Sequence, residues 1–450
     1  MIKRLLSGEA LSARALRGVS FALLGYGGSQ FLRLASNLIL TRLLFPEAFG
    51  LMALVSVFMV GIAMFSDLGV TPGILQSKRG DDPEFLNTAW TIQVIRGFGL
   101  WVTAAVLAWP MAQFYAEPQL TALIPAAAFT LVIIGFNPTS VDTANRHLLL
   151  GRVTLIDLAT QVIGILVAVW AAWMWQSVWA LVLSGLVAVI AQLFAYSRFL
   201  PGGRNRFRWE REAAAELIGF GKWIFLSTVA GFLYSQGDRA VLGKYLSIDV
   251  LGIYNLGYFM ASFPMMLGFS LVRKVMIPLY RERPPAGSRA NFLKHRRLRG
   301  ALTFGLLVMS GLLAFLGVWL IDLLYDPRYQ IAGAVVVLIA SAQMLPVISL
   351  TYDQAALASG DSRRFFVLAA AKALFMMVCL LIGAEVYGLF GAIAGQAVAM
   401  ALVYPVTVWL ALKQGAWDPL HDLIMTLLAL VLAGIAITWN WAAILGLMAF

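Results

Sequence analysis

Apolar runs of about 18 residues or more recur from one end of this 450-residue chain to the other. A helix of that length crosses the roughly 30 Å hydrocarbon core of a bilayer, because each residue adds about 1.5 Å. Hydrophobic residues make up 61% of the sequence and charged residues only 12%, a balance that ordinary soluble domains do not have. The sequence therefore predicts an all-α integral membrane protein that crosses the bilayer many times.

The apolar runs predict thirteen full spans and one shorter piece. They are expected at 18–42, 51–76, 88–113, 119–144, 153–175, 177–199, 216–241, 250–278, 300–325, 331–356, 364–384, 388–412, 420–438 and 440–450. The last piece is too short to cross the membrane unless it continues the helix before it. The chain is thus expected to have about 14 transmembrane helices, with thirteen and fourteen both open.

The basic residues lie in alternate loops. One loop carries Arg204, Arg206, Arg208 and Arg211, and another carries seven Lys and Arg between residues 281 and 299. Both loops fall on the same side of the membrane as the N-terminus, which the positive-inside rule places in the cytoplasm. The net charge of +11 therefore indicates membrane orientation and does not indicate nucleic-acid binding.

Two segments repeat at an offset of 202 residues. TRLLFPEAFGLM at 41–52 matches GKYLSIDVLGIY at 243–254, with a basic residue, an acidic residue and a glycine at the same places. An acid at a helix N-terminus and a glycine at a helix contact are also common in unrelated hairpins. The charge pattern of the six-span sets superposes at the same offset, however, and this favours two homologous bundles with parallel topology.

The repeat and the spans divide the chain into three expected parts. They are an N-terminal six-helix bundle at 1–200, a C-terminal six-helix bundle at 201–413, and extra C-terminal transmembrane helices at 414–450.

The first span has a polar face. At about 100° per residue, Tyr26, Gln30, Arg33 and Asn37 lie on one side of the helix. A guanidinium inside hydrocarbon costs at least about 2.5 kcal/mol, so such residues usually face a bundle interior or a wet cavity. Arg33 is expected to hold a substrate phosphate there through paired hydrogen bonds, or alternatively to pair with a neighbouring carboxylate.

Charged residues inside other spans extend this hypothetical site. Arg96 is expected to bind substrate, with snorkelling to the interface as the alternative. Asp67 either pairs with an arginine or carries a coupling proton. Asp238 and Arg239 point about 100° apart on one helix, so one of them is expected to face inward. We assign Arg239 to the substrate and Asp238 to coupling.

Two further carboxylates, Asp142 and Asp353, lie near cytoplasmic helix ends. Most such groups are interfacial, but some close an inner gate through charge pairs that form in one state only. We include both residues as gate or coupling positions.

The first-span residues Arg33 and Asn37, TRLLFPEAFGLMAL at 41–54, FSDLGVTPGILQ at 65–76 and GKYLSIDVLGIYNLGY at 243–258 together resemble the polysaccharide transport, or Wzx-type, flippases of the MOP superfamily. That superfamily also contains the MATE drug exporters and the peptidoglycan lipid flippases. With the span layout included, the resemblance covers almost the whole chain.

The resemblance implies a V-shaped pair of six-helix bundles in the bacterial cytoplasmic (inner) membrane. It also implies that the chain moves an undecaprenyl-diphosphate-linked oligosaccharide from the cytoplasmic to the outer leaflet by alternating access. Exopolysaccharide or lipopolysaccharide synthesis would use the product, alongside a polysaccharide polymerase and glycosyltransferases. No cofactor is implied beyond H⁺ or Na⁺ as a coupling ion, and the chain has no phosphate-binding loop for ATP.

Two other functions stand against this prediction. A MATE-like cation-coupled multidrug exporter has the same fold, but its cationic cargo calls for an acidic cavity. A membrane enzyme needs a positioned acid, base or metal, and usually a large external loop. The outer connections here are short and the three histidines form no metal-like cluster, so we expect no catalytic residue and no metal site.

Overall fold

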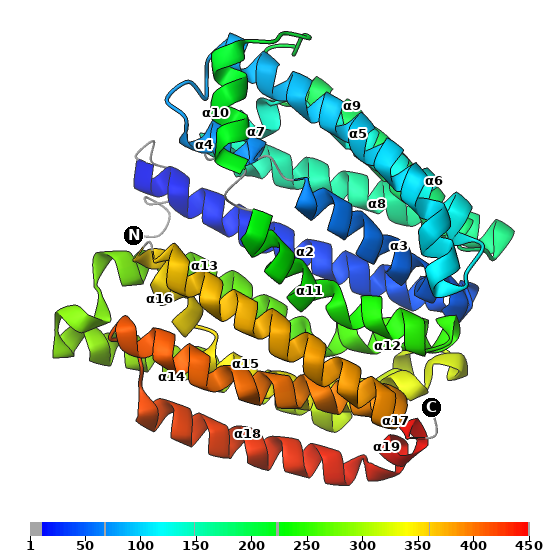
Figure 1. Cartoon of the computed structure of the whole chain (residues 1–450), viewed down its shortest axis with the longest axis vertical. Coiled ribbons are helices and arrows are strands. Elements are labelled where there is room, and N and C mark those ends of the chain that lie inside the picture. The colour runs from blue at the N-terminus through cyan, green and yellow to red at the C-terminus, as the bar shows by residue number, and fades with distance from the viewer. Residues whose placement is uncertain (1–10, 67–68, 148, 222–224, 360, 449–450) are drawn as a thin grey trace. The chain divides into compact units, whose positions relative to one another are not determined.

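The computed structural model describes residues 11–66, 69–147, 149–221, 225–359 and 361–448, and within these ranges the chain is almost entirely helical and contains no β-strand (Figure 1). Eight of the described helices are long and apolar enough to cross a membrane, or up to ten if each of two bent helix pairs is one span. The predicted all-α membrane class is confirmed. The count of thirteen or fourteen spans stays a prediction.

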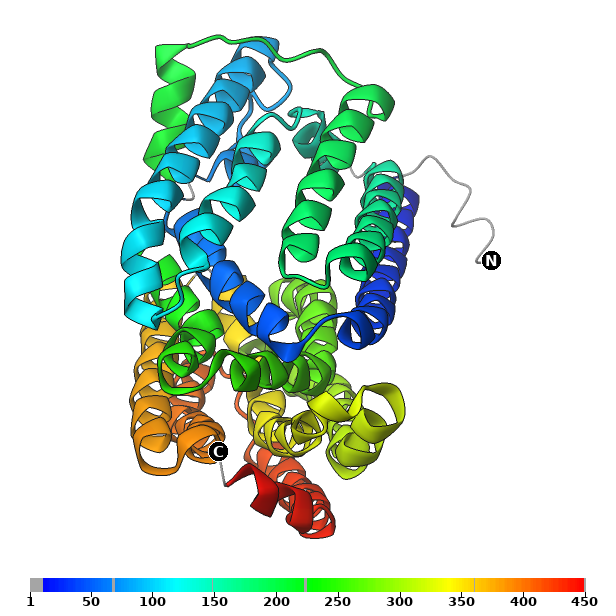
Figure 2. The same cartoon turned by 90° about the vertical axis from the view of Figure 1, so that its right-hand side faces the viewer.

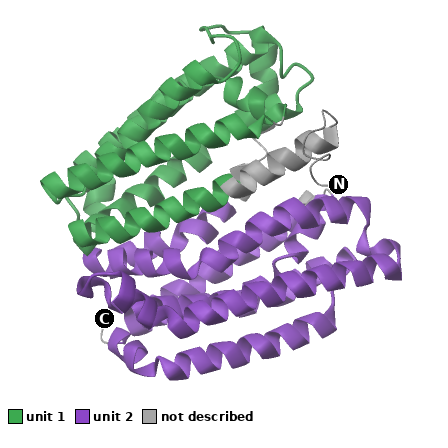
Figure 3. Ribbon diagram, turned by 180° about the vertical axis from the view of Figure 1, so that it is seen from behind, with its two compact units in different colours: residues 1–228 green, residues 229–450 purple. Residues whose placement is uncertain are grey.

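The chain forms two compact units, residues 1–228 and residues 229–450 (Figure 3). Each unit is a bundle of helices with its own buried core. The three-part division at residues 200 and 413 stays a prediction.

Unit 1 is built from nine described helices. They are α2 (Leu11–Leu43), α3 (Pro46–Phe65), α4 (Val70–Gln76), α5 (Pro83–Tyr115), α6 (Leu120–Gly135), α7 (Ser140–Arg146), α8 (Leu150–Trp175), α9 (Trp179–Phe199) and α10 (Arg211–Gly221). Helix α5 packs along α6, and α8 packs between α2 and α9 (Figure 2). At the α5–α6 contact, a Cβ on Gly97 would lie 2.7 Å from the Leu131 carbonyl oxygen, so glycine lets the two backbones approach.

Helix α10 attaches to unit 1 through one apolar face. Ala213, Ala214 and Leu217 on this face are buried against α4 and α5, in a cluster that includes Ile74 and Phe85. Arg211, Glu212, Ala215 and Glu216 on the other side are exposed. Because it is short and amphipathic, α10 covers the end of the bundle and does not cross the membrane.

Unit 2 contains α11 (Phe225–Tyr245), of which residues before Val229 belong to unit 1, then α12 (Ile248–Ala261), α13 (Phe263–Glu282), α14 (Arg289–Leu324), α15 (Ile331–Ser349), α16 (Tyr352–Ala358), α17 (Ser362–Lys413), α18 (Pro419–Trp439) and α19 (Trp441–Leu447). Two 3-10 turns, at Pro285–Gly287 and Pro327–Tyr329, flank α14. Helix α15 is the centre of this unit, because it packs against α12, α14, α17 and α18.

Helix α17 holds two of the predicted spans in one element. Its helix is broken at Tyr387 and Gly388, where Gly388 has φ 54° and ψ −134°. The two halves then run back along each other in close contact, since a Cβ on Gly391 would lie 2.1 Å from the Gly383 carbonyl oxygen. The break lies at the connection that the sequence predicts between spans 364–384 and 388–412.

The first hairpin of each unit has the same helix bounds at the offset of the sequence repeat. Helix α2 ends at Leu43 and α3 begins at Pro46, while α11 ends at Tyr245 and α12 begins at Ile248. Each difference is 202 residues. The residue before each second helix is extended, with φ −79° and ψ 156° at Phe45, and φ −64° and ψ 153° at Ser247. The two bundles are therefore related in local structure as well as in sequence.

Each unit also has a long apolar helix that is followed by a separate seven-residue helix. In unit 1, α6 is followed by the seven-residue α7 at an angle of 64°. In unit 2, Leu350 and Thr351 separate α15 from the seven-residue α16, and Ile331–Ala356 still counts as one continuous span. Both short helices carry an aspartate in their first turn, Asp142 and Asp353 respectively. Both carboxylates are buried within their bundles.

Candidate functional site

A cavity of about 430 Å³ lies inside unit 1. We call it the first cavity. Arg96 of α5 and Asp142 of α7 both line it, together with Gln93 and Asn137. The Asp142 side chain is only 7% exposed, and the side chains of Thr71 and Gln93 are its hydrogen-bonding neighbours. Two residues that the sequence assigned to different roles are thus brought to one polar space.

Arg96 is positioned by the end of α3. Its Nη2 donates to the carbonyl oxygen of Ala63 at 2.7 Å, and its Nε donates to Ser66 Oγ at 3.1 Å. Carbonyls in the last turn of a helix lack intrahelical partners, so a guanidinium is stabilised there. These hydrogen bonds hold the Arg96 side chain beside the segment that joins α3 to α4, where it lines the first cavity.

A smaller cavity of about 170 Å³ lies inside unit 2. We call it the second cavity. Lys372 of α17 and Asp353 of α16 line it and form an ion pair through Nζ and Oδ2. The Lys372 ammonium also lies 5.7 Å from the ring centroid of Tyr234, a cation–π contact. Asp353 is 6% exposed, so the pair is largely removed from water.

Asp238 and Arg239 lie side by side on α11 and each has its own partner. Asp238 is buried and accepts a hydrogen bond from the Tyr254 hydroxyl at 2.7 Å. Arg239 Nε donates to Asn255 Oδ1 at 2.8 Å, and its guanidinium lies 4.5 Å from the Tyr258 ring centroid. The two charges are 3.9 Å apart, so they also attract each other despite pointing to different sides of the helix.

The first-span residues lie along α2 in unit 1. Gln30 is buried, Tyr26 and Asn37 are partly buried, and Arg33 is exposed. Helix α2 is held against α8 nearby, where Gln161 Nε2 donates to the Ser29 carbonyl oxygen at 3.1 Å. Asp67 lies outside the described residues. The substrate and coupling roles of all ten predicted residues stay predictions.

One end of unit 1 carries Arg204, Arg206, Arg208 and Arg211, and we call it the arginine-rich end. Ion pairs connect the loops at this end. Arg79 pairs with Asp82 at 2.6 Å and with Glu210 at 2.7 Å. The hydrogen bonds from Arg79 hold the pKa of both carboxyls below their ordinary values. Arg146 of α7 donates to the carbonyl oxygens of Ile74 and Ser77, which joins α7 to the end of α4. The short helix that carries Asp142 is thereby anchored at its far end.

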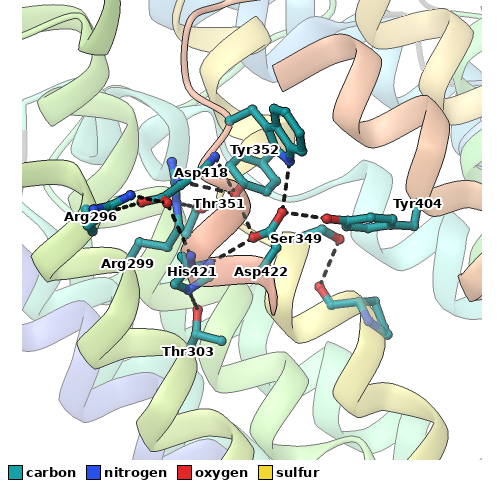
Figure 4. A network of polar contacts seen from close by, with 12 residues as sticks. Arg296, Arg299, Thr303, Ser349, Thr351, Tyr352, Tyr404, Asp418, His421 and Asp422 are labelled. Carbon is teal, nitrogen blue, oxygen red and sulfur yellow. Dashed lines mark hydrogen bonds and ion pairs between the residues drawn. The ribbon is translucent and has the colours of Figure 1, made fainter. Parts of the chain in front are cut away.

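A polar network joins α18 to the rest of unit 2 (Figure 4). We call it the tail network. The Asp422 carboxylate accepts hydrogen bonds from the hydroxyls of Tyr352 and Tyr404, each at 2.7 Å. It also lies 2.8 Å from His421 Nδ1. Asp418, one turn earlier, forms an ion pair with Arg296 of α14.

Arg299 is the largest buried side chain of the tail network. It is 1% exposed, and donates through Nε to Thr351 Oγ1 at 2.9 Å and through Nη2 to the Tyr280 hydroxyl at 3.1 Å. Its guanidinium lies 4.3 Å from the ring centroid of Tyr352. Because its partners come from α13, from α16 and from the turn between α15 and α16, Arg299 on α14 joins four parts of unit 2 and stabilises it.

Groups of three or more His, Cys, Asp or Glu side chains with metal-binding geometry do not occur among the described residues. This finding makes no statement about Asp67, which lies outside them.

A family model described as "Polysaccharide biosynthesis protein" matches residues 39–332, which is about two thirds of the chain and includes parts of both units. The chain belongs to this family. The family resemblance stated from residues 41–54, 65–76 and 243–258 is therefore confirmed.

Two curated relatives have names from polysaccharide synthesis. The lipopolysaccharide biosynthesis protein WzxC of Escherichia coli is 26% identical over 292 residues, which are 62% of this chain and 58% of that protein. The succinoglycan biosynthesis transport protein ExoT of Rhizobium meliloti is 23% identical over 270 residues, which are 59% of this chain and 53% of that protein. The chain thus spans little more than half the length of these relatives.

Solved structures share the fold over almost the whole chain. The lipid II flippase MurJ in an inward closed conformation superposes with a TM-score of 0.70 at 12% identity, over 96% of this chain and 98% of that one. An inward-facing MATE family multidrug transporter of the MOP superfamily gives 0.61 at 13% identity, over 86% and 95%. At such identities the likeness shows the fold alone, and the predicted MOP fold is confirmed.

Sequence reasoning missed Lys372, the basic partner in the second cavity. It lies within an apolar run, AAAKALFMMV at 369–378, and a lone lysine inside a span is itself a signal of an inward-facing group. The tail network was also missed, because its members come from five separate helices. Asp142 and Asp353 were assigned to gates near the interface, and the structure shows that both line cavities inside their bundles.

Proposed function

We propose that this protein translocates an oligosaccharide linked to a polyprenyl diphosphate from the cytoplasmic to the outer leaflet of the bacterial inner membrane. Its N-terminus lies in the cytoplasm, and an H⁺ or Na⁺ gradient drives alternating access. The glycan then goes to a polysaccharide polymerase, after glycosyltransferases have built it on the inner side. The protein catalyses no covalent change.

One observation carries the proposal beyond family membership. Each apolar bundle encloses a cavity that is lined both by a buried carboxylate on a seven-residue helix and by a basic side chain from another helix. Charged groups inside hydrocarbon cost so much that they are kept only where they serve an ion or substrate pathway or pair with one another. A diphosphate head group needs such polar surfaces to cross the membrane.

The MATE-like exporter remains the second candidate, because its structures share this fold. A pump for cations should present carboxylates without basic partners in its cavities. Here Arg96 lines the first cavity and Lys372 the second, so both spaces contain a positive charge. Because each cavity pairs one basic side chain with one carboxylate, neither has the purely acidic lining expected of a cation exporter, and this supports the flippase proposal.

The proposal is tested by translocation in reconstituted vesicles. Purified protein is placed in liposomes that contain a fluorescent diphosphate-linked oligosaccharide, and the fraction accessible to an external membrane-impermeant quencher is followed. Protein should make the inner label accessible when an ion gradient is imposed, and an ionophore should abolish the effect. Efflux of a cationic dye under the same gradient, with no movement of the lipid, would instead support the exporter.

Arg33→Ala tests the predicted phosphate contact within this function. Translocation should be lost while the protein remains folded, and Arg33→Lys should restore only part of it, because an ammonium lacks the bidentate fork. Arg152→Ala removes an exposed arginine at the start of α8 and is the matched control. Normal translocation by Arg33→Ala would remove this residue from the site and leave the flippase function itself standing.

A further inference from the structure

The segment from Gly203 to Glu210 runs over the arginine-rich end of unit 1 without belonging to a helix. Its backbone is held by the side chains of α5. The N–H groups of Arg206, Arg208 and Glu210 donate to Asn87 Oδ1, Thr91 Oγ1 and Thr88 Oγ1 at 2.9, 3.1 and 3.0 Å. Every second N–H is thus bound, which fixes an extended segment that has no strand partner of its own.

A cavity of about 440 Å³ lies between this segment, α9 and the junction of α6 with α7. We call it the arginine pocket. Arg198 of α9 and Arg204 of the extended segment line it, together with the aromatic rings of Trp90, Phe136 and Phe194. Gly203 lines it too, and a Cβ built on Gly203 would meet nothing within 4 Å.

The charge of the arginine pocket is wholly positive. None of its lining residues is acidic, and Ser140, Ser197 and Asn205 add neutral hydrogen-bonding groups. Other arginines at this end pair with carboxylates, as Arg79 does with Glu210 and Arg208 with Glu84. Among the described residues, Arg198 and Arg204 form no ion pair. Two guanidiniums that share a cavity without an acid are suited to a phosphate group.

The remaining wall of the pocket is apolar and continues onto the surface of α9. Phe194 is 68% exposed, and Phe199 and Ile190 on the same helix are also exposed. Helix α9 is one of the apolar helices long enough to cross a membrane. Trp90 and Phe136 pack edge to face, with ring centroids 6.0 Å apart, and close the inner side. A ligand in this pocket would contact two arginines at one end and an apolar helix surface at the other.

We propose that the arginine pocket binds an anionic phospholipid of the arginine-rich leaflet. Its phosphate lies between Arg198 and Arg204, and its acyl chain follows the Phe194 face of α9. Anionic lipids are concentrated in the cytoplasmic leaflet, where the positive-inside rule places this end of the protein. Trp209 and Phe207, both exposed beside the pocket, add the interfacial aromatic rings that accompany lipid-facing basic segments. The bound lipid fastens the extended segment to unit 1.

The experiment measures lipid binding by the full-length protein after delipidation in detergent. Short-chain phosphatidylglycerol is titrated while the thermal unfolding midpoint is followed, because a ligand that binds the folded state raises it in a saturable way. Phosphatidylcholine and glycerol phosphate are titrated in parallel. Phosphatidylglycerol alone should stabilise the protein, since the site needs both a net negative head group and an acyl chain.

Variants then assign the effect to the pocket. Each of Arg198→Gln and Arg204→Gln should weaken phosphatidylglycerol binding roughly five-fold, and the double variant roughly 25-fold. Gly203→Leu keeps every charge and fills the open space, so it should also lose binding. Arg211→Gln removes a nearby exposed arginine that does not line the pocket, and it should bind as the unchanged protein does.

The proposal is overturned if the double variant binds phosphatidylglycerol as tightly as the unchanged protein, or if glycerol phosphate alone gives the full stabilisation. Equal stabilisation by phosphatidylcholine overturns it as well. A photoactivatable phosphatidylglycerol provides a test that needs no variant. Its crosslinks should fall on the peptide from 190 to 209, and crosslinks confined to other helices would contradict the assignment.

Discussion

At the residue scale, the second cavity shows how a charge is kept inside a membrane bundle. Lys372 on α17 forms an ion pair with Asp353 on α16. The attraction between the two charges offsets the free energy that each would cost if buried alone. The same principle applies to Arg96, whose guanidinium is held by the carbonyl of Ala63 and the hydroxyl of Ser66. In both cases the partner lies at the end of a helix, in the last turn of α3 for Arg96 and in the first turn of α16 for Lys372.

Lys372→Met is expected to destabilise the protein by about 3 kcal/mol, because it leaves the Asp353 carboxylate buried and unpaired. Asp353→Leu should cost a similar amount through the unpaired ammonium. The double variant removes both charges and should recover most of the loss. The measurement is the unfolding midpoint of each protein in the same detergent. Additive losses in the double variant would show that the two groups do not depend on each other.

The sequence predicts some of these residues and not others, for a physical reason. Arg33, Arg96 and Asp67 are visible because a charge within an apolar run stands out on any helix. The partners of Arg96 are not visible in the sequence, because the contact between α5 and the end of α3 depends on how the chain folds. Asp142 and Asp353 looked interfacial in the sequence, since a helix break within a predicted span cannot be located from hydropathy alone.

At the element scale, the attachment of α18 depends on its first residues. Asp418 accepts from the backbone N–H of His421, pairs with Arg296, and donates its own backbone N–H to the Tyr352 hydroxyl. Burial raises the pKa of Asp418, but the hydrogen bonds from Arg296 and from the His421 N–H outweigh it, and the pKa lies below the ordinary 3.8. The ionised carboxylate is therefore the form that holds α18 in place.

Asp418→Asn should destabilise the protein by about 1.5–3 kcal/mol at neutral pH, because an amide keeps the helix cap and loses the charge-assisted bond. A carboxyl with a depressed folded pKa stabilises above its ordinary pKa and loses this contribution as the pH falls through the folded value. The difference in stability between the unchanged protein and Asp418→Asn should therefore decrease below pH 3.8. Unfolding midpoints between pH 3 and 7 measure it. Asp322→Asn, at an exposed position late in α14, is the control and should change the unfolding midpoint only slightly at neutral pH.

The break in α17 makes a second prediction at this scale. Gly388 has φ 54° and ψ −134°, a conformation that residues with a Cβ rarely adopt. Gly388→Ala should cost about 1–3 kcal/mol of stability. Gly305→Ala is the control, because Gly305 lies within α14 and a Cβ there meets nothing within 4 Å. Equal unfolding midpoints for the two variants would show that the backbone at 388 can relax.

At the scale of the whole molecule, the repeat can be detected in the sequence because it falls in a helical hairpin. The end of one helix and the start of the next favour particular residue types there. The Leu43–Pro46 and Tyr245–Ile248 junctions keep the offset of 202. Farther along the chain the offset changes, since α7 begins at Ser140 and its counterpart α16 at Tyr352, 212 residues later. Insertions between helices erase sequence periodicity while the bundle architecture persists. This explains why pairing the later helices required the structure.

The orientation of the whole chain is the last prediction, and it follows from the charge asymmetry of the loops. Cys379, which is the only cysteine, is first replaced by serine, and single cysteines are then placed at Lys78, Gln119, Ala290 or Tyr387. All four positions are exposed in connections or at helix ends. A membrane-impermeant thiol reagent added to intact cells should label positions 119 and 387 and should leave positions 78 and 290 unlabelled until the membrane is opened. Because basic loops resist translocation, we expect the loops that contain positions 78 and 290 to lie in the cytoplasm. Labelling of 78 and 387 from the same side would mean that a span between them is missing, and the parallel arrangement of the two bundles would then be wrong.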